Sequence, residues 1–301
     1  MLYSFIIVAR LPEYGIKRLT KGTLFVVATP IGNLDDLSPR ARQALDEADL
    51  IAAEDTRHTG RLLSHFGIKT RQIALHEHNE DAQTESLIAE LVNGRSVALV
   101  SDAGTPLVSD PGFRLLAAAH DQGIRVSPIP GASAVLSALS VAGLPTDHFC
   151  FEGFLPAKKA ARRVTIKALQ NERRTLVFFE SVHRIADTIE DMRVTFGGTR
   201  RAFVGRELSK LHEQCVRATL AELKEMLTDG TIPAKGEFVI VVEGSANKQS
   251  VDHKIDMNQL LTELAAVLPG GQAAAIASKL TGERKNDLYR LLLELGSEKT
   301  E

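Results

Sequence analysis

The stretch that decides the fold is Ser101-Asp102-Ala103-Gly104-Thr105-Pro106-Leu107-Val108-Ser109-Asp110-Pro111-Gly112. It follows an apolar, strand-like run at 96–100 and precedes a helix-like segment at 113–122. Its glycines allow a tight backbone turn, and its prolines fix φ and stiffen that turn. In open α/β sheets, small ligands bind at the carboxyl ends of strands, where such loops lie. The stretch therefore predicts a ligand-binding loop in an α/β protein, with an ordinary turn as the alternative.

The composition is that of a globular protein. The chain has 301 residues, of which 44% are hydrophobic and 25% charged, and this length suggests roughly two domains. A net charge of -2 gives no global nucleic-acid signal, so RNA affinity would have to come from a local patch. Cys150 and Cys215 lack metal-ligand spacing and indicate a reducing cytoplasm. The apolar run Phe5–Ala9 is too short to span a bilayer and makes a poor signal peptide.

Apolar strand-like runs alternate with helical periods through the first half, which predicts a parallel sheet with covering helices. The expected strands are 23–28, 50–53, 72–75, 96–100 and 124–126. From Pro145 onward the runs are longer and more aromatic, which predicts a mixed sheet. These runs are 148–154, 175–179, 201–204 and 237–242.

A polar, linker-like stretch at 245–253 precedes three helical periods at 259–268, 272–280 and 286–295. The last two flank Thr281-Gly282 and resemble a helix-turn-helix, although Ala-rich hairpins usually serve packing alone. We therefore expect four parts. They are a loosely ordered N-terminal extension at 1–21, an N-terminal α/β domain at 22–144, a second α/β domain at 145–244, and a linker with a C-terminal helical tail at 245–301.

Further loops at the ends of predicted strands carry polar or small residues. Loop 29–36 has one glycine and paired aspartates, so it is a weak match to an NAD or ATP fingerprint. Loop 54–59 contains Asp and Thr residues that a helix cap would explain, but a cap does not explain Arg57 and His58. The small residues of 128–134 let backbone N–H groups approach a carboxylate. In the second half, the loops 180–184 and 206–210 follow apolar strands.

The segment 157–175 is strongly basic, with seven Lys or Arg residues against the single acid Glu172. Charged helices are commonly solvated faces, but so local an imbalance in a nearly neutral chain favours a phosphate-contacting patch. We expect RNA contacts from Lys158, Lys159, Arg162 and Arg163.

With these loops in place, the chain resembles the tetrapyrrole-methylase-type (class III) methyltransferases that use S-adenosylmethionine. Within them it resembles the ribosomal RNA small-subunit methyltransferase I family. The matching motifs are ThrProIleGlyAsnLeu-x-AspLeuSer at 29–38, GluAspThrArg at 54–57, the opening stretch at 101–112, ProGlyAlaSerAla at 130–134, GlyPheLeuPro at 153–156 and ArgGluLeu-x-Lys at 206–210. Val182 stands where the family usually has Pro, and the first loop lacks the GlyxGlyProGly pattern of the tetrapyrrole enzymes.

The resemblance implies two α/β domains with S-adenosylmethionine in the cleft between them, no metal, and a cytoplasmic homodimer. It also implies methyl transfer to the ribose 2′-hydroxyl of a cytidine in the decoding region of 16S ribosomal RNA, either free or in the assembled small subunit. From residue type and family position we expect the cofactor to contact Pro30, Ser101, Asp102, Gly104, Thr105, Pro106, Ser109, Asp110, Gly131, Ser133 and Ala134. The expected catalytic residues are Glu54, Asp55, Arg57, His183, Arg206 and Lys210.

Two other classes of function stay open at this point. One is a methyltransferase of the same fold that acts on a tetrapyrrole or a protein side chain. The other is a non-catalytic, RNA-binding assembly factor that retains a cofactor pocket. Composition and spacing alone lead only to an α/β protein that binds a small ligand at its strand ends.

Overall fold

A computed structural model describes residues 22–246 and 257–297. The chain forms two compact units, the first ending at Ala246 and the second beginning at Asn247, and each is described by itself. The expected N-terminal extension at 1–21 and most of the expected linker lie outside the described residues.

The first sheet is parallel, as the alternation of strand-like and helical runs predicts. Its strand order is β3-β2-β4-β1-β5. The bounds are β1 Thr23–Val27, β2 Leu50–Ala53, β3 Gln72–Ala74, β4 Val97–Val100 and β5 Arg125–Ile129. Every strand pair in it is parallel, so the carboxyl ends of all five strands meet at one edge.

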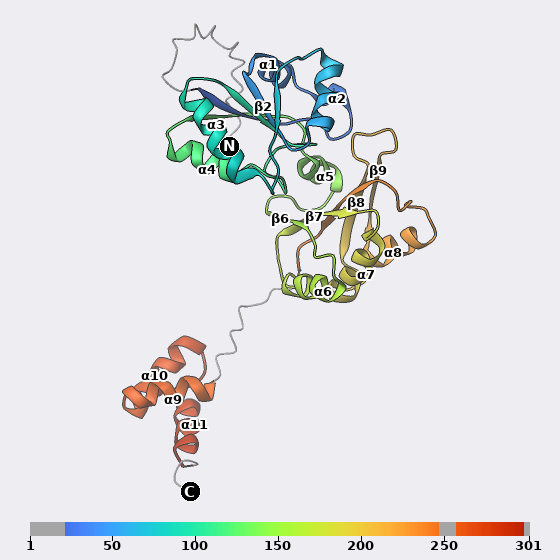
Figure 1. Cartoon of the computed structure of the whole chain (residues 1–301). Coiled ribbons are helices and arrows are strands. Elements are labelled where there is room, and N and C mark those ends of the chain that lie inside the picture. The colour runs from blue at the N-terminus through green and yellow to red at the C-terminus, as the bar shows by residue number, and fades with distance from the viewer. Residues whose placement is uncertain (1–21, 247–256, 298–301) are drawn as a thin grey trace, which may run out of the picture. The chain divides into compact units, whose positions relative to one another are not determined.

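Helices cover both faces of this sheet (Figure 1). One core joins α1 (Pro39–Glu47) and α2 (Thr56–Phe66) to the sheet, and another joins α3 (Glu80–Val92) and α4 (Phe113–Asp121) to its opposite face. A short 3-10 helix, η1 (Leu34–Asp36), precedes α1. The Ser38 hydroxyl caps α1 by accepting from the Ala41 N–H, as a Ser-Pro helix start predicts.

The second sheet is mixed, as expected, with the order β6-β7-β10-β8-β9. Its bounds are β6 Phe149–Phe154, β7 Thr175–Ser181, β8 Arg201–Arg206, β9 Gln214–Thr219 and β10 Glu237–Val242. Strands β6 and β7 pair in parallel, and the other neighbours in the sheet pair antiparallel. The sequence pattern missed β9, because this short edge strand mixes polar and apolar residues and has neither a continuous apolar run nor a strict alternation.

The helices α6 (Lys159–Ala168), α7 (Ile185–Phe196) and α8 (Leu220–Thr228) cover one face of the second sheet. The opposite face is covered by α5 (Ala134–Ala142), which the chain supplies directly after the last strand of the first sheet. Leu139 and Ala138 of α5 belong to the same core as Phe203 and Val241 of the second sheet. Helix α5 therefore shares a core with the second sheet, the two sheets belong to one unit, and Figure 1 shows α5 between them.

The second unit is a three-helix tail, which agrees with the predicted helical periods. It consists of α9 (Met257–Val267), α10 (Gly270–Thr281) and α11 (Lys285–Ser297), packed around Leu261, Ala274, Ala277 and Leu288. Gly282 ends α10 with a φ of 77°, a left-handed conformation that favours glycine. None of the helices among the described residues combines the length and apolar character needed to cross a membrane.

The shared core predicts that α5 is a principal source of stability for the first unit. Leu139 is 7% exposed, so Leu139→Ala leaves a cavity between α5 and the second sheet. We expect the free energy of unfolding, measured by urea denaturation, to fall by about 2–4 kcal/mol. The matched control is Leu136→Ala on the same helix, whose side chain is 59% exposed and whose loss should change stability by less than about 0.5 kcal/mol. Equal effects of the two changes would contradict a shared core.

Candidate active site

A cavity of about 360 Å³ lies between the carboxyl edge of the first sheet and one end of the second sheet. Loops after β2, β4 and β5 form one side of it, and residues of β6, β7, β8 and β10 form the other. Among the expected cofactor contacts, those that line this cavity are Asp102, Gly104, Thr105, Ser109, Asp110, Ser133 and Ala134.

The remaining expected contacts lie in the same loops but do not line the cavity. Ser101 is buried, and its carbonyl accepts from the Thr29 hydroxyl at 3.2 Å. Pro106 is also buried, and Pro30 is half-buried. Gly131 packs so closely on Ala28 that an added Cβ would meet the Ala28 Cβ at 3.0 Å. These four residues shape the loops, and the structure does not place them on the cavity wall.

Backbone hydrogen bonds join the loops that form the cavity floor. Thr29 and Gly104 exchange two N–H···O bonds of 2.9 and 3.0 Å, which link the loops after β1 and β4. The Thr105 hydroxyl donates to the Ala132 carbonyl at 3.1 Å and so links the loops after β4 and β5. Three strand ends are therefore held together before any ligand is present.

The loop after β4 contains unusual backbone conformations. Leu107 and Ser109 have φ values of 74° and 70°, in the left-handed region that non-glycine residues avoid at a cost of about 1–2 kcal/mol each. Gly104 and Gly112 take φ values of 81° and 121°, which suit glycine. Strain of this kind persists where surrounding contacts enforce it and is concentrated at functional sites.

Five acidic residues line the cavity: Glu54, Asp102 and Asp110 on the side of the first sheet, and Glu180 and Glu237 on the side of the second sheet. The Asp55 N–H donates to the Asp102 carboxylate at 3.1 Å, and the Asp102 N–H donates to the Glu54 carboxylate at 3.3 Å. Burial raises the pKa of Glu54, and the hydrogen bond from Asp102 opposes this rise. Burial also raises the pKa of Asp110 to about 6, with a contribution from the nearby carboxylates. Such a concentration of acids suits a cationic ligand or one with hydroxyl groups.

The opposite wall of the cavity is largely apolar, and its apolar residues were not predicted from the sequence. It includes Phe154, Phe179, Phe238 and Val239. Phe154 and Phe179 lie edge to face with their ring centroids 5.5 Å apart, and Phe154 remains 55% exposed. These residues carry no polar signal and are typical of an ordinary strand interior. Only the GlyPheLeuPro motif around Phe154 pointed to this side.

Of the expected catalytic residues, only Glu54 lines the cavity. Asp55 is the N-cap of α2 and accepts from the Arg57 N–H at 2.8 Å. Its carboxylate also pairs with the Arg57 guanidinium at 2.6 Å, and these bonds hold the pKa of Asp55 far below its usual range. Arg57 itself is 87% exposed. The capping interpretation of this loop thus holds for Asp55, and it leaves Arg57 at the surface.

The expected catalytic residues of the second half do not line the cavity either. His183 is exposed in the turn between β7 and α7. Arg206 is buried, and its guanidinium donates to the carbonyls of Lys235 and His212 at 2.6 and 2.9 Å. Lys210 pairs with Glu207 and Glu237 at 2.9 and 3.0 Å, and of these three only Glu237 lines the cavity. Arg206 therefore holds the loop after β8, and Lys210 orients a cavity residue.

Among the described residues, no group of three His, Cys, Asp or Glu side chains could hold a metal ion.

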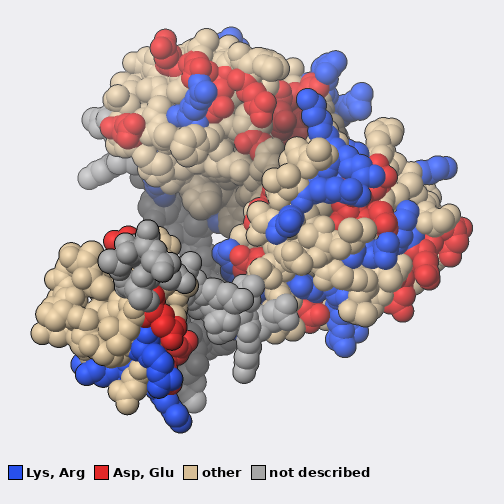
Figure 2. Space-filling view, turned by 90° about the horizontal axis from the view of Figure 1, so that it is seen from below, with Lys and Arg blue, Asp and Glu red and all other residues tan. Residues whose placement is uncertain are grey.

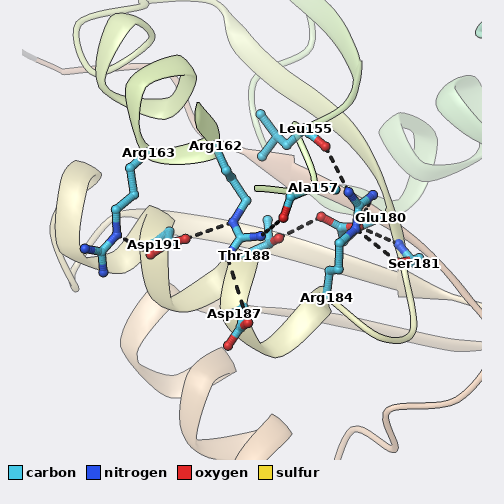
Figure 3. Close-up of polar contacts among 10 residues, drawn as sticks. All are labelled: Leu155, Ala157, Arg162, Arg163, Glu180, Ser181, Arg184, Asp187, Thr188 and Asp191. Carbon is cyan, nitrogen blue, oxygen red and sulfur yellow. Dashed lines mark hydrogen bonds and ion pairs between the residues drawn. The ribbon is translucent and has the colours of Figure 1, made fainter. Parts of the chain in front are cut away.

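The basic segment requires one correction: Arg162 cannot contact RNA. It is 2% exposed and pairs with Asp191 of α7 at 2.8 Å, as Figure 3 shows. Asp191 also pairs with Arg163 at 2.7 Å, but Arg163 keeps half of its side chain exposed. Arg162 and Ile166 lie one turn apart on the buried face of α6. The charge count could not show this, because the compensating acid is supplied by another helix.

Lys158, Lys159 and Arg163 remain exposed at the start of α6. Figure 2 views the molecule from the side on which Figure 1 draws α6 and α7, and Lys and Arg side chains gather there in a band with acidic side chains beside it. The predicted basic surface is therefore present in reduced form.

Comparison with known proteins places the chain in a family. The model of the Tetrapyrrole (Corrin/Porphyrin) Methylases matches residues 23–224, and that of the RsmI C-terminal HTH domain matches residues 252–296. The chain is 51% identical to ribosomal RNA small subunit methyltransferase I of Pseudomonas aeruginosa over 92% of this chain and 98% of that protein. It is 49% identical to the Escherichia coli O157:H7 protein of the same name, over 91% of this chain and 96% of that one.

Solved structures show the same fold at low identity. A diphthine synthase matches with a TM-score of 0.57 and 18% identity, over 74% of this chain and 90% of that one. A Thermus thermophilus uroporphyrin-III C-methyltransferase complexed with S-adenyl homocysteine matches with a TM-score of 0.51 and 16% identity, over 74% of this chain and 97% of that one. Together with the matched sequence, this assigns the chain to the tetrapyrrole methylase fold and, within it, to the S-adenosylmethionine-dependent ribosomal RNA small subunit methyltransferase I family.

Proposed function

We propose that this protein transfers the methyl group of S-adenosylmethionine to the ribose 2′-hydroxyl of a cytidine in the decoding region of 16S ribosomal RNA. The observation that carries the proposal is the cavity between the two sheets, which combines a carboxylate floor with an aromatic wall. The carboxylates suit the cationic groups and ribose hydroxyls of the cofactor, and the aromatic wall suits its adenine ring.

The residues of the cavity fit S-adenosylmethionine by their chemistry. Asp102 and Asp110 supply acceptors for the cationic groups and the ribose hydroxyls of the cofactor. The N-terminal backbone amides of α5, beside Ser133 and Ala134, suit its carboxylate. The apolar wall that includes Phe154 and Phe179 suits its adenine ring.

The cofactor, when bound, supplies an electrophilic methyl group that an in-line oxygen nucleophile can attack. A ribose hydroxyl is a weak acid, so holding it in line contributes more than removing its proton beforehand. Glu54 is the candidate acceptor for that proton, because it lines the cavity, burial raises its pKa, and Asp102 and Asp110 are assigned to the cofactor. Asp55 is a poor proton acceptor, because its pairing with Arg57 lowers its pKa.

The RNA would approach from the side of the exposed cations. Lys158, Lys159 and Arg163 precede or begin α6, which follows the cavity residue Phe154 closely in the chain. Arg57, which pairs with Asp55 in the loop after β2, supplies a further exposed guanidinium. Both groups suit phosphate contacts.

A cytoplasmic homodimer is part of the proposal. Exposed apolar side chains such as Phe113 (75%) and Leu211 (93%) are available for association of two copies. Light scattering on the purified protein gives the oligomeric state directly.

The acceptor is what separates this proposal from its rivals. The names of structural relatives include enzymes for uroporphyrin-III and a diphthine synthase, so the fold alone does not identify the acceptor. The sequence relatives named for ribosomal RNA, which match along nearly the whole chain, favour RNA over a tetrapyrrole or a protein side chain. A non-catalytic assembly factor would bind the cofactor without turnover.

The first prediction concerns the pH dependence of cofactor binding. A bound cation stabilises the Asp110 carboxylate, so it lowers the pKa of about 6 and binding releases a proton. Affinity for S-adenosylmethionine should therefore rise with pH, and fall about fourfold between about pH 7.5 and about pH 5.5. Calorimetry should show that Asp110→Asn binds more weakly at the higher pH and loses this dependence. The exposed Asp121→Asn is the matched control, and a dependence retained in Asp110→Asn would remove Asp110 from the cofactor site.

The second prediction tests the reaction itself. Small subunits purified from a strain that lacks the gene should gain a 2′-O-methyl group on one decoding-region cytidine when they are incubated with the protein and labelled cofactor. Mapping by nuclease digestion and mass spectrometry identifies the nucleotide. Glu54→Gln should lower the single-turnover rate by about 100-fold.

The control for that change is Glu85→Gln, an exposed glutamate on α3. Methylation at a base, or of a protein or tetrapyrrole instead of RNA, would overturn the proposed acceptor. Cofactor binding with no transfer to small subunits or naked RNA would favour the assembly factor. A normal rate in Glu54→Gln would leave the reaction intact but remove Glu54 from it.

The third prediction concerns the basic surface. Neutralising Lys158, Lys159 and Arg163 with glutamine removes up to three cations that suit phosphate groups. The slope of log affinity for RNA against log salt should flatten by about 0.7–0.9 for each phosphate that is no longer neutralised. Cofactor affinity should not change. The matched control neutralises the exposed Arg40, Arg61 and Lys69 near the helices of the first sheet. An unchanged slope in the variant that lacks Lys158, Lys159 and Arg163 would show that the start of α6 is an ordinary solvated surface and does not contact RNA.

A further inference from the structure

The end of β7 carries a buried carboxylate that the proposed reaction does not use. The Glu180 side chain is 0% exposed and pairs with Arg184 at 2.9 Å. Its two oxygens also accept from the Thr188 hydroxyl and the Ser181 N–H, both at 2.7 Å. Burying an ion pair costs several kcal/mol of desolvation, so such pairs are weak evidence for stability and call for another explanation.

Arg184 connects this carboxylate to the segment that follows β6. Its guanidinium donates to the Leu155 carbonyl at 3.1 Å and to the Ser181 hydroxyl at 3.3 Å, in addition to its pairing with Glu180. Figure 3 shows Arg184 lying between these groups. A planar guanidinium can serve several acceptors at once in a fixed geometry, which a lysine ammonium on its flexible stem cannot do equally well.

The segment that Arg184 holds carries part of the cavity wall. Leu155 follows Phe154, which lines the cavity, and Ser181 lines it as well. The far end of the segment is held from the other side, because Arg162 of α6 donates to the Ala157 carbonyl at 3.5 Å. Phe154 itself is 55% exposed and lies at the end of its strand, so it depends on its neighbours for its position.

We propose that Arg184, charge-balanced by the buried Glu180, is a positioning residue that fixes Phe154 against the cofactor. It touches neither the cofactor nor the RNA. The same segment, residues 155–158, joins Phe154 to the first turn of α6. The contacts of Arg184 therefore also hold the proposed RNA-facing helix next to the aromatic wall of the cavity. The inference rests on the family's use of S-adenosylmethionine and does not require that RNA is the acceptor.

The discriminating variant is Arg184→Lys, which keeps a cation beside Glu180 but removes the guanidinium N–H that donates to the Leu155 carbonyl. The chain contains no tryptophan, so Phe154→Trp supplies a single fluorescent reporter at the cavity wall. In that background we expect Arg184→Lys to raise acrylamide quenching of the reporter and to weaken binding of S-adenosylhomocysteine about tenfold. In the protein that retains Phe154, Arg184→Lys should raise the KM for S-adenosylmethionine, while kcat should change by less than about twofold.

The matched control is Arg193→Lys on the same helix, where Arg193 pairs with Glu190 at 2.8 Å and contacts no cavity residue. It should change neither quenching nor affinity. Hydrogen exchange of residues 154–158, measured well below Tm of each variant, separates local loosening from general destabilisation. We expect faster exchange there in Arg184→Lys and unchanged exchange in α1.

Unchanged quenching and affinity in Arg184→Lys would overturn the proposal. So would weaker binding without a change at the reporter or in the exchange of 154–158, because the effect would then not pass through Phe154. The binding assay contains no RNA, so its outcome is independent of the acceptor proposed above.

Discussion

The packing of α5 on the second sheet is the contact on which the rest of the first unit depends. This helix follows the last strand of the first sheet without a long connection, yet its apolar side chains join the core of the other sheet. A short, strongly apolar helix cannot stay exposed to water, and the second sheet offers the surface that buries it. By covering that sheet, α5 brings the carboxyl edge of the first sheet against the strands that supply the aromatic wall.

The cavity that results combines two environments that neither sheet provides alone. The first sheet contributes carboxylates at the ends of β2 and β4, held by reciprocal hydrogen bonds between Glu54, Asp55 and Asp102. The second sheet contributes phenylalanines that exclude water and so strengthen the electrostatic interactions of those acids. Burial, together with neighbouring carboxylates, raises the pKa of Asp110 and of Glu54.

Charged residues in this protein divide between structural and surface roles according to their partners. Arg162, Arg184 and Arg206 are all held by acids or by backbone carbonyls, and each fixes a helix or a loop. Lys158, Lys159 and Arg57 remain accessible. The basic segment therefore has two roles within a single turn of α6. Arg162 is buried and anchors the helix to Asp191, whereas Lys159 and Arg163 are exposed at the surface. The buried side of α6 keeps the helix in place, so that the cations of its exposed side have fixed positions.

The sequence by itself determined the α/β class, the parallel and mixed sheets, the helical tail, and the strand-end loops that form the cavity floor. These features follow from local patterns: runs of apolar residues, helix caps, and glycine or proline at turns. It also brought Asp102, Asp110 and Glu54 to one edge of the sheet, where they line the cavity, since the carboxyl ends of neighbouring parallel strands must meet.

Only the tertiary structure decided which of the predicted site residues face the cavity. The edge strand β9 lacks a continuous apolar run, Arg162 is buried by an acid 29 residues away, and Arg206 is taken up by two carbonyls. The aromatic wall consists of strand residues that in the sequence are typical of a hydrophobic core. They line the cavity because α5 packs on the second sheet and so brings the two sheets together. Burial and ion pairing depend on neighbours that are distant in the chain, and local sequence patterns do not contain that information.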